Sequence, residues 1–316
     1  MPSVVYGAVL LLNFHKQAQI FIFQTRKRQS LGIPLQTKTK MFRTPLTPKW
    51  TFFILVAVCV CFFTALDLLS ATPLIGTLDK LDKAVMQALN FDGGFALDQF
   101  WFAVSAKTVW IPIAAALLIS FSYGKQDVLI PVFIVVGLAL TVTLADQISS
   151  SLIKPYFTRF RPSHNEEICD LLHYVNNYKS GKYGFVSSHA ANAFGVLAFL
   201  APFMRHKISV VVLAVWTCMV SYSRIYLGVH YPGDIIGGAL VGFTSGLGVQ
   251  IAMQWLYMKV RSKCNKQSAT NGLTQSFNSN YITTAIIGTA VYILLYSFGQ
   301  STMLTNITSA YITMLY

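Results

Sequence analysis

The residues best suited to chemistry in this chain are cations, imidazoles and one carboxylate that occur in three short clusters. These clusters are Lys154-x6-Arg161-Pro162, Val186-Ser187-Ser188-His189 and Ser223-Arg224-x5-His230-x3-Asp234. Charged side chains are costly near hydrocarbon, and the flanking segments are apolar, so the grouping needs an explanation. Three cations, two histidines and one carboxylate are the groups required to bind a phosphate and transfer it through a histidine.

The cations Lys154, Arg161 and Arg224 suit a phosphate group. A transferring phosphoryl group spreads negative charge over its equatorial oxygens, which guanidinium groups bind in pairs and a lysine binds as a point charge. A single Lys or Arg near the end of a membrane span is more often a snorkelling side chain. Three of them together with two histidines favour a phosphate site that requires no metal ion.

The second cluster directly precedes an Ala-rich apolar segment, which places Ser187 and Ser188 at the start of a helix. Serines there cap the helix, and the same position directs free backbone N–H groups and the positive end of the helix dipole at an anion. Both roles stay open for the serines. His189 can protonate a departing oxygen if its pKa lies near the working pH.

The third cluster places a carboxylate four residues after a histidine. Asp234 lies within reach of one imidazole nitrogen of His230, which fixes the tautomer and leaves the other nitrogen free to act as a nucleophile. Pro232 suits a first helical turn, and Gly233 permits close approach of the backbone. A lone His–Asp pair is more often structural, but the three cations and His189 favour catalysis.

The composition indicates an integral membrane protein. Of the 316 residues 54% are hydrophobic and only 11% are charged, and the mean hydropathy is +0.54. Soluble domains carry about a quarter charged residues. The net charge of +13 resides mostly between apolar segments rather than in one basic, aromatic patch, which argues against nucleic acid as a partner. The five cysteines occur without a metal-binding or disulfide spacing.

Apolar stretches of about 20 residues predict seven membrane-spanning helices. They lie at 50–71, 100–123, 128–150, 187–204, 208–227, 235–258 and 282–299. Most of the 24 Lys and Arg residues lie in the segments 1–49, 124–127, 205–207 and 259–281, which the alternation of spans places on one side. This bias puts the amino terminus in the cytoplasm and all three clusters on the outer face.

The chain divides into three expected parts. Residues 1–48 form a cytoplasmic tail, 49–260 the membrane-embedded domain, and 261–316 a basic cytoplasmic linker with an appended span. Because Met41 opens a short basic lead into the first span, we expect translation to begin there, with residues 1–40 absent or disordered. Detection of a peptide from residues 1–25 by mass spectrometry of the native protein would contradict this expectation.

The combined pattern resembles the type 2 phosphatidic acid phosphatase family, whose lipid phosphate phosphatases share a core with vanadium haloperoxidases. Its motifs are KxxxxxxRP, PSGH and SRxxxxxHxxxD. The first matches Lys154–Pro162 and the third matches Ser223–Asp234 in full. The second matches in part, because Val186 replaces Pro and Ser188 replaces Gly. The resemblance covers about residues 50–260.

The resemblance implies a role for each motif residue. His230 would attack phosphorus to give a phosphohistidine, Asp234 would orient it, and His189 would protonate the leaving group. The phosphate oxygens would be held by Lys154, Arg161, Arg224, Ser187 and Ser188. Ser188 is the least certain of these, because Ser is less permissive in backbone conformation than Gly, although its hydroxyl can donate to a phosphate.

The apolar segments and the three motifs predict an all-α polytopic membrane enzyme, a six-helix core plus one extra carboxy-terminal span. It would remove phosphate from a membrane lipid without a metal or cofactor, so activity should survive EDTA. A bacterial inner membrane with a periplasmic site is expected. Polyprenyl diphosphate and lipid A are the leading substrates, with phosphatidylglycerophosphate and phosphatidate as further candidates. The alternatives are a lipid-linked phosphotransferase and a non-catalytic lipid-binding or transport protein.

Several other residues are weaker candidates. Lys107 could contact a second phosphate, although snorkelling is favoured, and Asp146 could pair with a site cation or join two helices. A polar loop holds irregularly spaced metal-ligand types and is expected to be solvated rather than to bind metal: His164, Glu166, Glu167, Asp170 and His173. Gly238, Gly242 and Gly246 recur every four residues and predict close helix packing.

Overall fold

The computed structural model describes residues 48–122, 129–204, 206–264 and 279–315. The expected start at Met41 and the tail before residue 48 lie outside these ranges, as does most of the basic linker. Within the described ranges the secondary structure is helical, apart from one isolated β-bridge between Phe160 and Tyr183.

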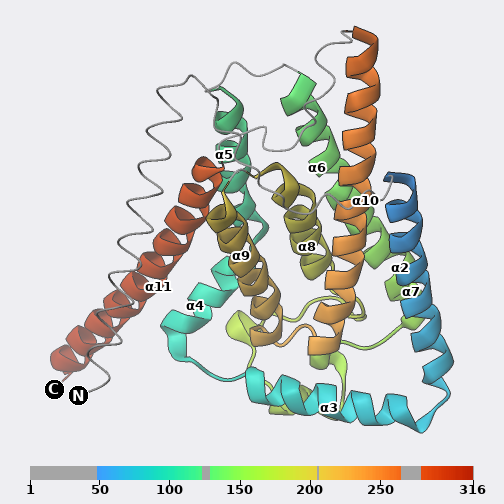
Figure 1. Cartoon of the computed structure of the whole chain (residues 1–316). Coiled ribbons are helices and arrows are strands. Elements are labelled where there is room, and N and C mark those ends of the chain that lie inside the picture. Colours follow the sequence, from blue (N-terminus) through green and yellow to red (C-terminus); the bar gives the residue numbers. More distant parts are fainter. Residues whose placement is uncertain (1–47, 123–128, 205, 265–278, 316) are drawn as a thin grey trace, which may run out of the picture. The chain divides into compact units, whose positions relative to one another are not determined.

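Long apolar helices run alongside one another (Figure 1). They are α2 (Pro48–Ser70), α6 (Leu129–Gln147), α9 (Lys207–Tyr226), α10 (Pro232–Cys264) and α11 (Asn280–Leu315), with the shorter α8 (Ser188–Leu200) among them. By length and composition four described helices can cross a membrane, and two bent helix pairs raise the number to six. The prediction of an all-α polytopic membrane protein is confirmed.

The span expected at 100–123 is not one continuous helix. It consists of α4 (Gly94–Val104) and α5 (Trp110–Ser122), joined by a 3-10 turn at Lys107–Val109, and the two parts are bent by 65°. The break follows Ser105, which is still helical, and the backbone becomes extended at Ala106. Apolar composition alone concealed this break, which turns the polar side chains of Ser105 and Lys107 toward the site.

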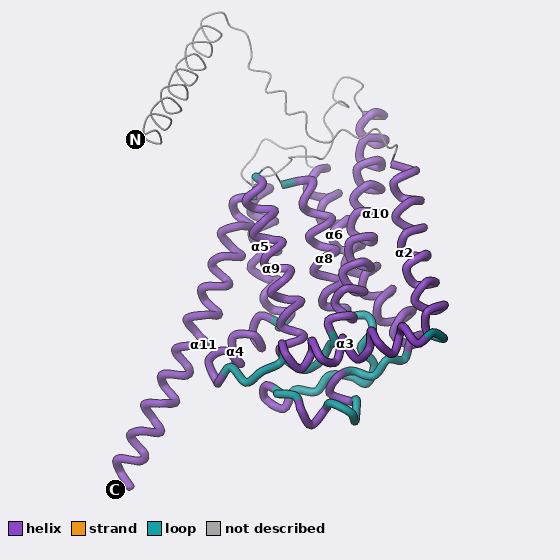
Figure 2. Tube along the Cα trace, turned by 60° about the horizontal axis from the view of Figure 1, so that its bottom comes forward, coloured by secondary structure: helices purple, strands orange, loops and turns teal. Residues whose placement is uncertain are grey.

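A helix that the sequence reading did not predict follows the first span. Helix α3 (Pro73–Leu89) is bent by 104° from α2 and runs across the ends of the other helices, where the loops also gather (Figures 1 and 2). Leu74, Leu78 and Leu81 are exposed and recur at helical spacing, while Met86 is buried. Its two faces mark α3 as an amphipathic helix across one end of the bundle.

Helices α8 and α10 form the most extensive helix contact, and glycines permit it. A Cβ added at Gly238 would lie 2.5 Å from the backbone oxygen of Ser187, and Gly242 and Gly246 face the α8 backbone in the same way. The prediction of close packing through these glycines is confirmed. The packing brings the start of α8, with the second cluster, against the start of α10, with Asp234.

The last helix shares the core of the others. Ile282, Ile286 and Ile293 of α11 are buried in the same apolar cluster as Phe199 of α8 and Trp216 of α9. Helix α11 packs against α4, α5 and α9. The described part of α11 thus belongs to one compact unit with the preceding helices. The domain boundary expected near residue 260 stays a prediction.

Candidate active site

The first cluster lies where the α6 helix ends. The helix continues through a π-helical turn (Ile148–Ile153) into α7 (Lys154–Phe157) and stops at Thr158, whose φ of 45° is left-handed. The chain then becomes extended, and the Arg161 N–H donates to the backbone oxygen of Lys182 at 3.0 Å. This pairing holds the first cluster against the segment that leads into the second.

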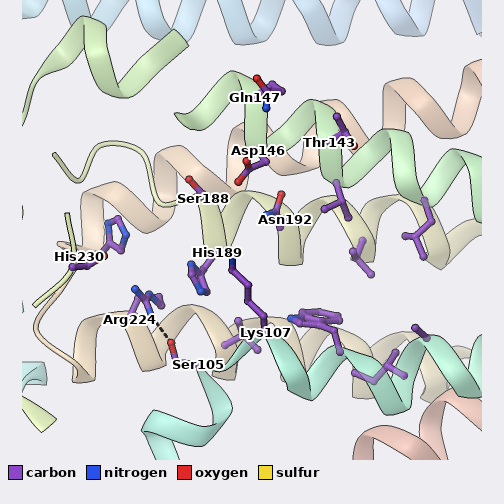
Figure 3. Close-up of a pocket in the computed structure, with 18 of the residues that line it drawn as sticks. Ser105, Lys107, Thr143, Asp146, Gln147, Ser188, His189, Asn192, Arg224 and His230 are labelled. Carbon is purple, nitrogen blue, oxygen red and sulfur yellow. Dashed lines mark hydrogen bonds between the residues drawn. The ribbon is translucent and has the colours of Figure 1, made fainter. Parts of the chain in front are cut away.

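All three clusters contribute to one cavity of about 660 Å³. Its polar end is lined by Lys154, Arg161, Ser188, His189, Arg224 and His230. Figure 3 shows His189, Arg224 and His230 in this cavity, contributed by α8, α9 and the segment before α10. Leu117, Leu138 and Leu200 line it further from the motifs. A cavity with a cationic end and an apolar end suits an amphiphile with an anionic group.

His230 and Asp234 form the predicted pair. The Nδ1 atom of His230 lies 3.1 Å from Oδ2 of Asp234, and both side chains are almost wholly buried. The other nitrogen, Nε2, lies 2.8 Å from Nη1 of Arg161. Burial and the charges of Arg161, Arg224 and Lys154 hold the pKa of the His230 imidazole well below 6.5. His230 is therefore neutral at neutral pH, as a nucleophile must be.

Arg161 and Arg224 are buried cations that face this cavity. Arg161 donates from Nε to the backbone oxygen of Tyr183 at 3.0 Å and from Nη1 to that of Val229 at 3.1 Å. Burial and the neighbouring charge of Arg224 lower the pKa of Arg161 to about 10. The buried Nε of Arg224 has no hydrogen-bond partner among the described residues. An anion between the two guanidinium groups would offset their repulsion.

The serine that departs from the family pattern is bound to the lysine of the first cluster. Lys154 donates from Nζ to Oγ of Ser188 at 2.6 Å. The same oxygen lies 3.1 Å from Oγ of Ser149 and 2.9 Å from Oγ of Ser150. The Ser188 hydroxyl thus fixes the position of Lys154 at the edge of the cavity.

Ser187 and His189 differ in their placement. Ser187 is fully buried and caps α8, where its Oγ accepts from the Ala190 N–H at 3.5 Å. It does not line the described cavity, so its predicted contact with phosphate stays a prediction. His189 does line the cavity, and Figure 3 places its ring near Arg224 and the Lys107 side chain.

The sequence did not point to two residues of this site, Ser105 and Tyr178, and it favoured another role for a third, Lys107. Ser105 Oγ accepts a hydrogen bond from Arg224 Nη1, and the Tyr178 ring lies 5.7 Å from the Arg224 guanidinium carbon. Lys107, expected to snorkel, lines the cavity and extends toward His189 (Figure 3). Asp146 also lines the cavity. Two polar residues inside an otherwise apolar segment, Ser105 and Lys107, were the sequence signal that could have identified this part of the site.

The polar loop between the first two clusters is tied to the helices. His173 Nε2 lies 2.9 Å from Oδ2 of Asp98 in α4, and Glu167 pairs with Lys83 of α3 at 2.6 Å. The Tyr226 hydroxyl donates to the same Asp98 at 2.7 Å. Ligand atoms of His173, Asp98 and Asp92 lie within 4.8 Å of one another, a grouping the sequence spacing did not predict. His164, Glu166, Glu167 and Asp170 are exposed, as expected for a solvated loop, whereas His173 is partly buried against Asp98.

Fold and site together define a membrane-embedded protein with a cationic, histidine-bearing cavity at one end of its helices. The model of the PAP2 superfamily matches residues 132–261. A lipid A 4'-phosphatase of Bacteroides thetaiotaomicron is 34% identical over 191 residues, which are 60% of this chain and 81% of the relative. One of Porphyromonas gingivalis is 37% identical over 167 residues, 53% of this chain and 70% of the relative.

Among solved structures, the crystal structure of Aquifex aeolicus LpxE aligns with a TM-score of 0.40 and 24% identity, covering 52% of this chain and 92% of that one. The extent of the two lipid A 4'-phosphatase matches decides the family. The chain belongs to the PAP2 superfamily. The resemblance seen in its motifs is confirmed, and with it the predicted enzyme class, an integral membrane lipid phosphatase.

Proposed function

We propose that the chain hydrolyses a phosphate monoester of a membrane lipid through a phosphohistidine on His230, with lipid A as the leading substrate. The observation that carries the proposal is the placement of His230. Its Nδ1 is bound to Asp234, and its Nε2 lies in a cavity beside Arg161 and Arg224. The choice of substrate is supported by similarity to two lipid A 4'-phosphatases, which are 34% and 37% identical over 81% and 70% of their own length.

The proposed reaction has two steps. Lys154, Arg161 and Arg224 bind the phosphate oxygens, and Nε2 of His230 exchanges its contact with Arg161 for phosphorus. As the N–P bond forms, the bond from phosphorus to the lipid oxygen breaks, and His189 gives that oxygen its proton. Neutral His189 then takes a proton from water, which attacks phosphorus and releases inorganic phosphate and free His230.

The reaction is proposed to take place at the outer face of a bacterial inner membrane. The cationic part of the cavity is lined by residues from the start of α8 and the end of α9, at the end of the bundle where α3 and the loops gather (Figure 2). The basic residues Lys207, Lys259 and Arg261 lie toward the other ends of their helices, which supports a cytoplasmic position for those ends. The apolar part of the cavity would accept a lipid chain from the bilayer.

Polyprenyl diphosphate is the second candidate substrate, and Lys107 is the observation that favours it. This ammonium lines the cavity beside the motif residues, where it could bind the phosphate that stays on the lipid. A comparison of 4'-phosphorylated lipid A with farnesyl diphosphate, using protein purified in detergent, tests both. Release of phosphate from neither lipid would contradict the proposed function.

The rival functions separate in the same assay. A phosphotransferase would form a new phosphate ester when a soluble alcohol is added, whereas a hydrolase forms mainly inorganic phosphate. A non-catalytic binding or transport protein would release no phosphate. Replacement His230→Ala should abolish release, and unchanged release by the pure variant would remove His230 from the mechanism.

A further inference from the structure

A second charged cluster lies next to the cavity but does not line it. Arg159 forms ion pairs with three carboxylates: its Nη1 lies 3.1 Å from Asp234, and its Nη2 lies 2.8 Å from Asp82 and 2.9 Å from Asp79. Its guanidinium carbon also lies 4.2 Å from the centre of the Tyr231 ring. Arg159 occupies a position that the KxxxxxxRP pattern leaves free, so no motif assigns it a role.

Arg159 completes the set of contacts around Asp234. Oδ1 of Asp234 accepts from Arg159, while Oδ2 accepts from the Tyr231 backbone N–H at 3.1 Å and lies 3.1 Å from His230 Nδ1. The side chain of Asp234 is fully buried. A buried carboxylate without a cation is strongly disfavoured, so Arg159 favours the charged form of Asp234 and restricts the rotation of its side chain.

The other side of the cluster belongs to the amphipathic helix α3. Asp82 binds Arg159 and also accepts from the Gly233 N–H at 2.8 Å, in the first turn of α10. A Cβ on Gly233 would lie 2.7 Å from Oδ2 of Asp82, so a larger residue there would displace the Asp82 side chain. Lys83 joins Asp79 to Glu167 of the loop at 2.7 Å and 2.6 Å. Helix α3 is thus bonded to the segment that carries His230 and Asp234.

We propose that Arg159 and the α3 carboxylates Asp79 and Asp82 are positioning residues for the Asp234–His230 pair, so that helix α3 is part of the phosphoryl-transfer machinery. This proposal rests on the proposed role of His230 as nucleophile. Imidazole attack needs Nε2 aimed at phosphorus, and a small rotation of Asp234 would misdirect the ring. The chain of contacts from α3 through Arg159 to Asp234 resists that rotation.

The test compares variants of the purified full-length protein on 4'-phosphorylated lipid A. Arg159→Met should lower kcat about 100-fold and leave KM within about 3-fold, because substrate contacts are intact. Arg159→Lys keeps the charge and should recover about 10-fold of the loss. Asp82→Asn should lower kcat about 5-fold. Lys182→Met removes an exposed cation from the same region, which stacks on Phe160 and Tyr183, and should change nothing.

The rate of phosphohistidine formation, measured by rapid alkaline quenching, distinguishes positioning from a purely structural role of Arg159. The burst amplitude gives the amount of active protein, and the rate is expressed relative to that amount. Positioning predicts a slower rate in Arg159→Met and partial recovery in Arg159→Lys. Lower amplitude at a wild-type rate would overturn the proposal. If Arg159→Met does not fold, Arg159→Lys and Asp82→Asn decide: wild-type kcat in both would overturn it, and reduced kcat at unchanged KM would support it.

His230→Ala in the same series separates this inference from the proposed function. An inactive His230→Ala beside a fully active Arg159→Met overturns the positioning role alone. Wild-type activity of His230→Ala overturns the proposed function, and the inference with it.

Discussion

Arg159 and Arg161 lie two residues apart in one extended segment, and the fold uses them in opposite ways. Arg159 is bound to Asp79, Asp82 and Asp234, whose charges outweigh burial and raise its pKa above the usual value for arginine. Arg161 donates to backbone oxygens and faces the cavity, and no ion pair is present for it in the described part of the chain. Burial and Arg224 lower its pKa to about 10. The fold pairs Arg159 with carboxylates and leaves Arg161 facing the cavity, as the proposed phosphate site requires.

The largest expected effect comes from the cation that faces the cavity. Arg161→Met should lower kcat/KM for 4'-phosphorylated lipid A by about 1000-fold, because it removes a charge-assisted contact to the transferring phosphoryl group. Steady-state release of inorganic phosphate measures this. Lys182→Met is the matched control for loss of a cation. A loss for Arg161→Met below about 10-fold would show that the two arginines do not differ as described.

For thermal stability, we expect Arg159→Met to have a larger effect than Arg161→Met. Arg159→Met leaves three carboxylates without their shared cation and should cost on the order of 2 kcal/mol, less than a fully buried pair because the side chain is 25% exposed. The melting temperature in detergent should fall by roughly 5 °C. Arg161→Met relieves repulsion with Arg224 and should shift it less. Inorganic phosphate should stabilise the wild-type protein but not Arg161→Met, and equal stabilisation of both would contradict the contrast.

The pH dependence should show that Arg161 acts on His230. In the proposed mechanism the imidazole of His230 reacts in its neutral form, and burial together with Arg161, Arg224 and Lys154 holds its pKa well below 6.5. Protonation of His230 should therefore lower kcat/KM only at pH values well below 6.5. Removal of the positive charge in Arg161→Met raises the pKa, so the acid limb should move to higher pH. The pH profiles of wild-type protein and Arg161→Met are measured on the same substrate, so ionisation of its phosphate affects both profiles equally. Superimposable acid limbs would contradict an effect of Arg161 on His230.

The smallest effect concerns Lys107, a third kind of cation, exposed yet lining the cavity. If it binds a second phosphate, Lys107→Met should lower kcat/KM for farnesyl diphosphate about 10-fold, the equivalent of one charge-assisted hydrogen bond. For dodecyl phosphate the change should stay within about 2-fold. Lys80→Met on exposed α3 surface is the control. Equal losses on both substrates would assign Lys107 to the shared phosphate site or to packing.

The sequence was sufficient for the seven apolar segments, all of which contain helix, and for the residues that gather in one cavity. Motif spacing identifies the groups that are proposed to contact phosphate. Motif spacing could not reveal the ion pairs of Arg159, because its partners Asp79 and Asp234 lie 80 and 75 residues away in the sequence and come close only in the folded chain. Helix α3 was missed because its polar residues interrupt the apolar run, although leucines at helical spacing were a usable signal.

The break between α4 and α5 was hidden for a different physical reason. Residues 100–123 are apolar enough to predict one span, and composition does not record the local backbone conformation at Ala106. The break serves the site, because it lets Ser105 accept from Arg224 and directs Lys107 into the cavity. Likewise, the hydrogen bond from Lys154 to Ser188 could not be inferred from a motif in which glycine is usual.

The most direct test of the central claim is to trap the phosphorylated protein. Purified wild-type protein is mixed with radiolabelled 4'-phosphorylated lipid A, quenched in alkali to preserve phosphohistidine, and digested for peptide mass spectrometry. The account predicts label on His230, none in His230→Ala, and slower labelling in Arg159→Met. Label on another residue, or turnover by His230→Ala at the wild-type rate, would contradict it.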